Sequence, residues 1–276
     1  MKIKDYSVSQ EEFELVYDPN LELFQTRPLP QNLEKYYESE EYISHTDSKK
    51  TLFDRLYQLV KSINLKSKIR VIEKYKHGKV NLLDIGAGTG DFVNSCKITK
   101  KWTAIGIEPN PKARKLAQNK GIEIVENYEQ LPQKSFDVIT LWHVLEHLPD
   151  LENQIRKINS LLTENGILIV AVPNFKSWDA QHYKQFWAAY DVPRHLWHFS
   201  KTSIKKIFTE KGFQLLETKP MWFDAFYVSI LSESYKSGKK NFIKGFLSGM
   251  RSNLYGIQKN EFSSHIYVLK KLKNDF

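Results

Sequence analysis

The sequence contains little cysteine and no long hydrophobic run. Its single cysteine, Cys96, cannot form a disulfide within the chain, which fits a reducing compartment. Because no stretch of about 18 apolar residues is present, we expect no membrane span. Residues 1–10 are too polar for a secretion signal. We therefore expect a cytoplasmic protein, while the oligomeric state stays open.

Charge is unevenly distributed along the 276 residues. The net charge is +9, yet residues 1–47 hold 11 acidic and 4 basic side chains. Residues 61–79 and 231–276 are basic instead. Basic surfaces attract phosphates, acidic lipids or anionic metabolites, although an ordinary solvated surface has the same composition. The hydrophobic content of 41% is enough for one main domain.

Three of the 12 glycines stand at alternate positions, Gly86, Gly88 and Gly90. An apolar run at 80–85 precedes them, and a helix-like pattern begins at Phe92. This order predicts a strand, a tight turn and a helix. Glycine reaches positive φ without strain and lets a ligand approach the backbone, and a helix start offers unpaired N–H groups. We expect a ligand to contact this turn.

The spacing of the glycines favours one ligand class over another. A dinucleotide-binding G-x-G-x-x-G would need its third glycine at position 91, which is Asp91. The pattern Asp84-x-Gly86-x-Gly88-x-Gly90 instead resembles the first motif of class I S-adenosylmethionine-dependent methyltransferases. Taken alone, an ordinary tight strand-to-helix turn would also fit.

Further apolar segments follow at the spacing of an alternating strand and helix pattern. Residues 102–107 end at Glu108, which can accept hydrogen bonds from both hydroxyls of a ribose. Three more strands are predicted, at 122–125, 136–141 and 166–172. They are followed directly by residues 126–128, residues 142–149 and Pro173, respectively. Such alternation predicts a parallel sheet with ligands at the carboxyl ends of its strands.

Together these motifs, over about 95 residues, resemble class I methyltransferases. Within that superfamily the chain looks most like the group that includes quinone-biosynthesis O-methyltransferases, through Leu-Asp-Ile-Gly-x-Gly-x-Gly and Val-Leu-Glu-His-Leu. The resemblance implies an α/β fold with a Rossmann-like, doubly wound, seven-stranded sheet whose last strand is antiparallel, and S-adenosylmethionine as cofactor. Its expected cofactor-binding residues are Asp84, Gly86, Ala87, Gly88, Gly90, Glu108, Asn127, Tyr128, Trp142 and His143.

We expect an accessory or lid segment at residues 1–50, with a helix at 31–42, and a methyltransferase domain at 51–276 with insertions at 174–199 and 219–260. A helical pattern covers 52–75 with a break near Asn64. The resemblance suggests that the leading segment folds over the substrate, so Tyr37 and Tyr42 are candidate substrate contacts. Packing of aromatic side chains is the alternative.

Residues 174–199 are too long for an ordinary connection and are rich in aromatic and polar side chains. Loops at the carboxyl edge of such a sheet usually select the substrate. We therefore predict the acceptor pocket here, with Trp178, Trp187, Asp191, Arg194, His195 and His198 as substrate-binding residues.

S-adenosylmethionine carries its own reactive methyl group, so the protein mainly has to position the acceptor. If the acceptor is a hydroxyl, a base must take its proton, and histidine suits that role near neutral pH. His143, His147 and His195 are the candidate catalytic residues.

The stretch from His143 to His147 also matches H-x-x-E-H, the zinc signature of inverzincin metallopeptidases. A predicted strand ending at Leu141 and the proline at 149 leave little helix for such a site. Quinone O-methyltransferases that resemble this chain have Glu-x-x-Glu-His here. A divalent metal bound by His143, Glu146 and His147 is therefore one alternative interpretation. A metal bound by Asp191, His195 and His198 is another. We predict no metal site.

The sequence therefore predicts methyl transfer to an oxygen of a small-molecule or glycan or lipid-precursor acceptor. Two alternatives stay open. One is an RNA methyltransferase that uses the basic segments, although no RNA-binding domain is recognisable and nucleic acid is not an expected partner. The other is a non-catalytic S-adenosylmethionine-binding protein in which residues 219–260 dock a partner.

Overall fold

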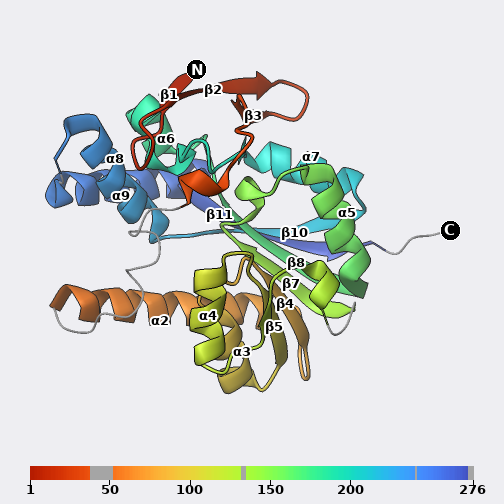
Figure 1. The fold of residues 1–276 in the computed structure, drawn as a ribbon. Helices are drawn as coiled ribbons and strands as arrows, with labels where there is room; N and C mark the ends of the chain where they lie inside the picture. Colours follow the sequence, from red (N-terminus) through yellow and green to blue (C-terminus); the bar gives the residue numbers. More distant parts are fainter. Residues whose placement is uncertain (38–51, 132–134, 240, 273–276) are drawn as a thin grey trace. The chain divides into compact units, whose positions relative to one another are not determined.

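The computed structural model describes residues 1–37, 52–131, 135–239 and 241–272 (Figure 1). Contacts along the chain divide it into two compact units. Unit 1 comprises residues 1–38, 142–156 and 170–269, and unit 2 comprises residues 39–141, 157–169 and 270–276. None of the described helices combines the length and the apolar character needed to cross a bilayer.

Unit 2 is built on short parallel strands. β4 (Asn81–Ile85) pairs with β5 (Thr103–Ile107) and β7 (Phe136–Trp142), and β5 pairs with β6 (Ile124–Val125). Their side chains are almost all buried, as expected for strands covered on both faces. The helices α2 (Leu52–Glu73), α3 (Asp91–Lys100) and α4 (Pro111–Asn119) connect or precede these strands.

The start of α4 is encoded locally. The side-chain oxygen of Asn110 accepts hydrogen bonds from the N–H groups of Lys112 and Ala113 at 2.9 and 3.2 Å, and Pro111 occupies the first helical turn. Both features are typical of helix N-termini. They fix the path of the chain immediately after Glu108.

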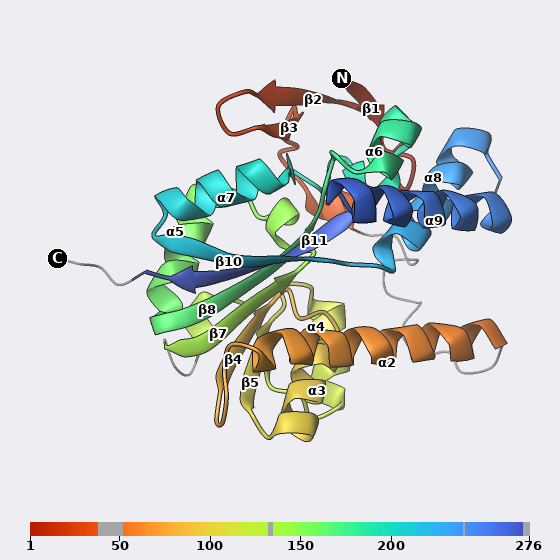
Figure 2. The same cartoon turned by 180° about the vertical axis from the view of Figure 1, so that it is seen from behind.

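The large sheet has seven strands in the order β10-β11-β8-β7-β4-β5-β6 and is mostly parallel, with one antiparallel pair. The predicted Rossmann-like, doubly wound fold is confirmed. Figure 2 shows β8 (Leu162–Pro173), β10 (Phe213–Pro220) and β11 (Ser264–Lys271) side by side, although about 90 residues separate β8 from β11.

A second sheet lies in unit 1. It consists of β1 (Lys2–Lys4), β2 (Glu12–Asp18), β3 (Leu23–Arg27) and β9 (Trp197–His198). Phe24 and Gln25 of β3 pair antiparallel with His198 and Trp197. The amino-terminal hairpin therefore holds the end of the predicted acceptor loop.

The predicted acceptor loop forms α6 (Trp178–Tyr183) and two short 3-10 turns, η4 (Lys184–Phe186) and η5 (Ala188–Tyr190). After α5 (Leu151–Leu161) and α7 (Lys201–Glu210), the predicted helical insertion at 219–260 forms α8 (Asp224–Ser237) and α9 (Phe242–Lys259). Both views show α8 and α9 packed alongside each other (Figures 1 and 2).

Three local predictions were wrong. α2 runs through Asn64 without a break, because one asparagine costs only a fraction of a kcal/mol in a long helix. β8 begins at Leu162, four residues before the predicted start of this strand at 166, and Asn165, at φ 60°, lies within it. The segment predicted as a helix at 31–42 has a single 3-10 turn, η1 (Glu34–Tyr36), in its described part. Tyr42 and the boundary near residue 50 lie outside the described residues.

Candidate functional site

The glycine-rich turn of unit 2 has the geometry that its sequence predicts. Gly86, Gly88 and Gly90 have φ angles of 71°, 56° and 76°, which L side chains rarely adopt. Gly90 is the N-cap of α3, so the first N–H groups of that helix border the turn. A Cβ added to Gly88 would have no neighbour within 4 Å. The backbone of this residue is therefore open to a ligand.

Glu108, at the end of β5, is fixed against this turn. Its Oε2 accepts from the N–H of Gly88 at 2.8 Å, and its Oε1 accepts from the N–H of Asn110 at 2.8 Å. Burial raises the pKa of Glu108, and these two N–H groups oppose the rise. Each carboxylate oxygen has a further lone pair that can accept a hydrogen bond from a neighbouring hydroxyl. The arrangement suits the two hydroxyls of a ribose.

Asp84 lies on β4, two residues before Gly86. It is only 3% exposed, and the hydroxyl of Thr140 on β7 donates to its Oδ1 at 2.6 Å. Burial raises the pKa of Asp84 to about 7. The side chain is buried, and its bond to Thr140 joins β4 to β7 near the start of the glycine turn.

Asn127 and Tyr128 follow β6, at the same carboxyl end of the strands of unit 2. The side-chain Oδ1 of Asn127 is buried and has no hydrogen-bond partner among the described residues. A buried acceptor without a donor is costly, so an N–H group of a ligand would stabilise it. Burial raises the pKa of Tyr128 to about 12, and Lys157 lies 4.3 Å from the centroid of its ring. The amino group of an adenine is a suitable donor to Asn127.

Trp142 and His143, which were also predicted as cofactor contacts, belong to unit 1. Leu141 pairs with Ile85, the residue before the glycine turn, and the chain passes from Leu141 directly into Trp142. The backbone of His143 has a φ of 57°, and its N–H donates to the carbonyl of Ala171 at 2.9 Å.

Unit 1 contains a buried polar cluster made by Glu146, His147 and His195. Their ligand atoms lie within 4.8 Å of one another. The rings of His147 and His195 meet edge to face, with centroids 4.5 Å apart. Glu146 is 1% exposed, and neither of its carboxylate oxygens has a hydrogen-bond partner among the described residues.

The hydrogen bonds of the two imidazoles define their tautomers. Nδ1 of His147 lies 3.0 Å from the carbonyl oxygen of Arg194, and Nδ1 of His195 lies 2.8 Å from that of Ala189. A carbonyl oxygen can only accept, so both Nδ1 atoms carry hydrogen. In a neutral ring this leaves the lone pair on Nε2. Burial, and next the neighbouring His195, lower the pKa of His147 to about 4, so this ring is neutral at pH 7.

The Nε2 lone pair of His147 can accept a proton from a bound hydroxyl, and Glu146, His147 and His195 together could bind a divalent cation. The backbone carbonyls that hold the two Nδ1–H groups are the kind of support that metal-binding histidines also have. The cluster contains Glu146 and His147, two of the three residues considered from the sequence as ligands of a divalent metal. The third member is His195 and not His143.

His143 has a different environment. Its Nε2 lies 2.9 Å from a carboxylate oxygen of Asp224, and its Nδ1 lies 3.4 Å from Glu146. Burial lowers the pKa of His143, but the Asp224 and Glu146 carboxylates outweigh this and raise it to about 10. The ring therefore carries a positive charge at neutral pH, which compensates the buried carboxylate of Glu146.

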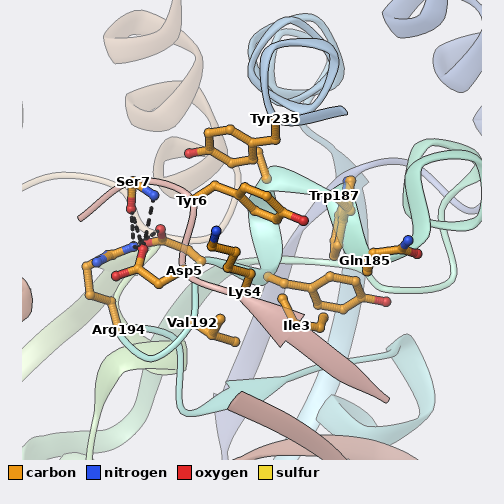
Figure 3. Close-up of a pocket in the computed structure, with 13 residues that line it drawn as sticks. Ile3, Lys4, Asp5, Tyr6, Ser7, Gln185, Trp187, Val192, Arg194 and Tyr235 are labelled. Atoms are coloured by element: carbon orange, nitrogen blue, oxygen red, sulfur yellow. Dashed lines mark hydrogen bonds and ion pairs between the residues drawn. The ribbon is translucent and has the colours of Figure 1, made fainter. Parts of the chain in front are cut away.

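Arg194 and Asp191, predicted as substrate-binding residues, form an internal ion-pair network with Asp5. The guanidinium binds both oxygens of Asp191, at 3.0 and 2.7 Å, and Asp5 at 3.0 Å. It also donates to the hydroxyl of Ser7 and, at 3.2 Å, to the carbonyl of Tyr36. Figure 3 shows Arg194 directed at Ser7 and Asp5. The network joins the amino-terminal segment to the loop that carries His195.

Two further predicted substrate residues also make internal contacts. Nε2 of His198 lies 2.9 Å from the hydroxyl of Thr26, which itself donates to the carbonyl of His195 at 2.6 Å. The indole N–H of Trp187 donates to the buried carboxylate of Asp179 at 2.8 Å. These bonds fix the backbone on either side of His195.

The remaining candidates are less enclosed. Trp178 stacks on His182, with ring centroids 4.5 Å apart. The hydroxyl of Tyr37 lies 3.1 Å from Nδ1 of His147, so Tyr37 is the predicted lid residue that reaches the histidine cluster. Tyr42 lies outside the described residues.

Sequence reasoning missed Asp5 and Thr26 as supports of this cluster. Asp5 is 189 residues from Arg194, and Thr26 is 169 residues from His195. No local motif marks either residue. The only available signal was the acidic character of the amino-terminal segment, which contains Asp5.

Comparison with known proteins shows the family of the chain. A family model described as a methyltransferase domain matches residues 39–218. A ubiquinone biosynthesis O-methyltransferase of Actinobacillus pleuropneumoniae is 32% identical over 107 residues, which is 34% of this chain and 45% of that protein. An uncharacterized protein of Methanocaldococcus jannaschii is 32% identical over 136 residues, 45% of this chain and 51% of that protein. The chain thus spans about half the length of these relatives.

Two solved structures share the fold at low sequence identity. One is phosphoethanolamine N-methyltransferase 2 of Haemonchus contortus, in complex with phosphomonomethylethanolamine and S-adenosylhomocysteine. It has a TM-score of 0.54 and 15% identity over 75% of this chain and 53% of that one. The other is a SAM-dependent methyltransferase from Archaeoglobus fulgidus, with a TM-score of 0.50 and 19% identity over 75% of this chain and 93% of that one.

Proposed function

The chain belongs to the class I S-adenosylmethionine-dependent methyltransferases, and we propose that it transfers the methyl group to an oxygen of a small molecule or of a glycan or lipid precursor. The observation that supports use of this cofactor most directly is the bond between Gly88 and Glu108, which places a carboxylate against an open glycine turn. The uncompensated acceptor on Asn127 is the second support.

Three parts of unit 2 would contact the cofactor. The turn at Gly86–Gly90 would hold the amino-acid end, Glu108 the ribose hydroxyls, and Asn127 with the Tyr128 backbone the adenine. When bound, S-adenosylmethionine supplies a methyl group on a sulfonium, a leaving group that needs no activation by the protein. The contribution of the protein is then to position the acceptor and remove its proton.

For the acceptor, we assign the proton-accepting role to His147, with His195 beside it. The Nδ1–H of His147 is held by the carbonyl of Arg194, so its Nε2 can accept a hydrogen bond from an acceptor hydroxyl. With a pKa near 4, the ring is unprotonated at pH 7, so its Nε2 lone pair is available. The carboxylate of Glu146 would stabilise the imidazolium once it forms, as it already favours the charged ring.

His143 is the weaker candidate for a base. Because its pKa is raised to about 10, it already carries a proton at neutral pH. We therefore assign it a supporting role, in which its charge balances Glu146 and Asp224. The similarity to ubiquinone biosynthesis O-methyltransferases supports oxygen as the acceptor atom.

The proposal can be tested with S-adenosylmethionine that carries tritium in its methyl group. The full chain is incubated with a cell extract, which is then separated into an organic phase, small aqueous metabolites and precipitated RNA. We expect label in the organic or small-metabolite fraction and none in RNA. His147→Asn should reduce this label strongly while leaving the affinity for S-adenosylhomocysteine unchanged.

Other outcomes would favour the alternatives. Label in the RNA precipitate would support an RNA methyltransferase and contradict the assignment of a small acceptor. Binding of S-adenosylhomocysteine without label in any fraction would support a non-catalytic binding protein. Equal label with wild type and His147→Asn would remove the role assigned to His147.

A further inference from the structure

Helix α9 packs with its small side chains. The residues that it buries, at the spacing of one helical face, are Gly245, Ser248, Gly249, Ser252, Asn253 and Gly256. A Cβ at Gly245 would lie 2.6 Å from the Cα of Ile230, and one at Gly249 would lie 2.8 Å from the Cα of Phe226. α8 and α9 therefore approach each other closely, and the packing face of α9 has no room for large residues.

The large apolar residues of α9 are exposed instead. Their exposed fractions, in chain order, are Phe242 50%, Ile243 77%, Phe246 50%, Leu247 56%, Met250 42%, Leu254 57% and Ile257 61%. Counted from Phe242, they stand at positions i, i+1, i+4, i+5, i+8, i+12 and i+15, so they share one side of the helix. Trp222, Phe223 and Tyr227, at and just before the start of α8, are exposed as well. We call these ten residues the α8–α9 apolar face.

This distribution is the reverse of an ordinary surface helix, which buries large apolar side chains and exposes small or polar ones. Single exposed apolar residues are normal in proteins, and Ile98 on α3 is one such residue here. Seven such residues along one side of α9 form a group of a size that marks a surface for binding a partner.

The charge around the face indicates which partner. Residues 234–260 contain six Lys or Arg residues and no Asp or Glu. Arg251 and Lys259 lie on α9 itself, outside its buried stripe, and Lys239 is exposed in the turn before it. Lys244 on α9 pairs with Glu233 at 3.1 Å, but cations remain in excess around the face. Large apolar side chains beside an excess of cations are typical of helices that lie in the interface of an anionic membrane.

We propose that the α8–α9 apolar face docks unit 1 onto the surface of an anionic lipid bilayer. The apolar side chains enter the boundary between headgroups and acyl chains, and the cations contact lipid phosphates. α9 has 18 residues and is about 27 Å long. Lying in the membrane plane, it serves as an interfacial anchor. This inference does not depend on methyl transfer.

The test measures co-flotation of the full chain with vesicles. One set contains phosphatidylcholine alone, and the other contains phosphatidylcholine with phosphatidylglycerol. Ile243→Asp is compared with Ile98→Asp, because the two isoleucines are exposed to similar extents, 77% and 72%. We expect Ile243→Asp to lower partitioning into anionic vesicles by at least about tenfold and Ile98→Asp to leave it unchanged, because the lost methylenes each contribute to insertion.

A second pair of variants tests the charge. Lys239→Glu is compared with Lys112→Glu, an exposed lysine on α4. We expect about a tenfold or greater loss for Lys239→Glu, which follows from roughly 1 kcal/mol for each charge near the surface. Far-UV circular dichroism and S-adenosylhomocysteine affinity check that each variant is folded.

Three results would overturn the proposal. The first is an absence of binding to anionic vesicles by the wild type. The second is equal binding by Ile243→Asp and Ile98→Asp, and the third is equal binding to both vesicle types. If sedimentation velocity shows that the chain self-associates through a contact that Ile243→Asp abolishes, while vesicles are not bound, the face joins two copies of the chain.

Discussion

The Arg194 network gives a quantitative prediction for unit 1. In Arg194→Leu, the carboxylates of Asp5 and Asp191 lose their cation but stay in place. The Asp5 side chain is fully buried and the Asp191 side chain is 25% exposed. Removing one partner of such a buried pair typically costs about 3–5 kcal/mol, because uncompensated charge is left behind. We expect a loss of this size in the free energy of unfolding at pH 7.

The sign of the pH dependence follows from the pKa values. Burial alone would raise the pKa of Asp5 and Asp191, but Arg194 holds both below their usual range. The stability that they contribute is present above about pH 4 and is lost as pH falls through the lowered values. In Arg194→Leu, protonation relieves the uncompensated charge. Because burial without the cation raises the pKa of both acids in the variant, the difference between wild type and variant should shrink as the pH falls from 7 toward about 4, and further below it.

Urea unfolding at pH 7 and at about pH 4, followed by tryptophan fluorescence, measures both effects. Arg156→Leu is the matched control, because Arg156 pairs with Glu152 at 3.0 Å on an exposed helix face. Its expected cost is below about 0.5 kcal/mol. Similar losses for the two variants, or a loss for Arg194→Leu that grows on acidification, would refute the reasoning.

Three further predictions concern single contacts. Gly90→Ala should lower the free energy of unfolding by about 2–4 kcal/mol, because its Cβ would meet Ile122 at 2.9 Å in a left-handed backbone. Gly121→Ala is the control, since a Cβ there meets open space, and it should lower the free energy of unfolding by only about 1 kcal/mol. Chemical denaturation measures both. Asn127→Leu should weaken S-adenosylhomocysteine binding about tenfold in calorimetry. It should not destabilise the chain, because it removes a buried acceptor that has no donor among the described residues. Unchanged affinity would count against the adenine assignment. In an NMR titration, the ring of His143 should stay protonated up to about pH 9 and titrate near its raised pKa of about 10. Asp224→Asn should move that pKa toward the usual histidine range. Titration of the wild-type ring near pH 6.5 would contradict the assigned charge.

The geometry of the glycine turn in unit 2 was predictable because its information is local. The apolar strand, the three glycines and Glu108 all lie within residues 80–108, and backbone geometry requires glycine at the positive φ angles. The parallel sheet followed from the same alternation of strands and helices. Asp84 and Thr140 show the limit of this reasoning, because the bond between them depends on the pairing of β4 with β7.

The acceptor side was less predictable because distant segments build it. The chemistry-bearing residues of 174–199 were recognised, but Arg194, Asp191 and His198 turned out to bond to the amino-terminal segment and to one another. Side-chain type gives no indication of whether an arginine faces a substrate or an aspartate 189 residues away. The predicted break in α2 was wrong for a related reason, since a weak local preference at Asn64 does not decide the course of a 22-residue helix.

The central claim is that the turn at Gly86–Gly90 and Glu108 together bind the methyl donor. Isothermal titration of the full chain with S-adenosylhomocysteine tests it most directly, with Glu108→Ala as the comparison. We predict saturable binding at one site per chain and at least about tenfold weaker binding by the variant, from the loss of hydrogen bonds to a charged acceptor. Absence of binding by folded wild-type protein, or equal affinity of the two proteins, would contradict the claim.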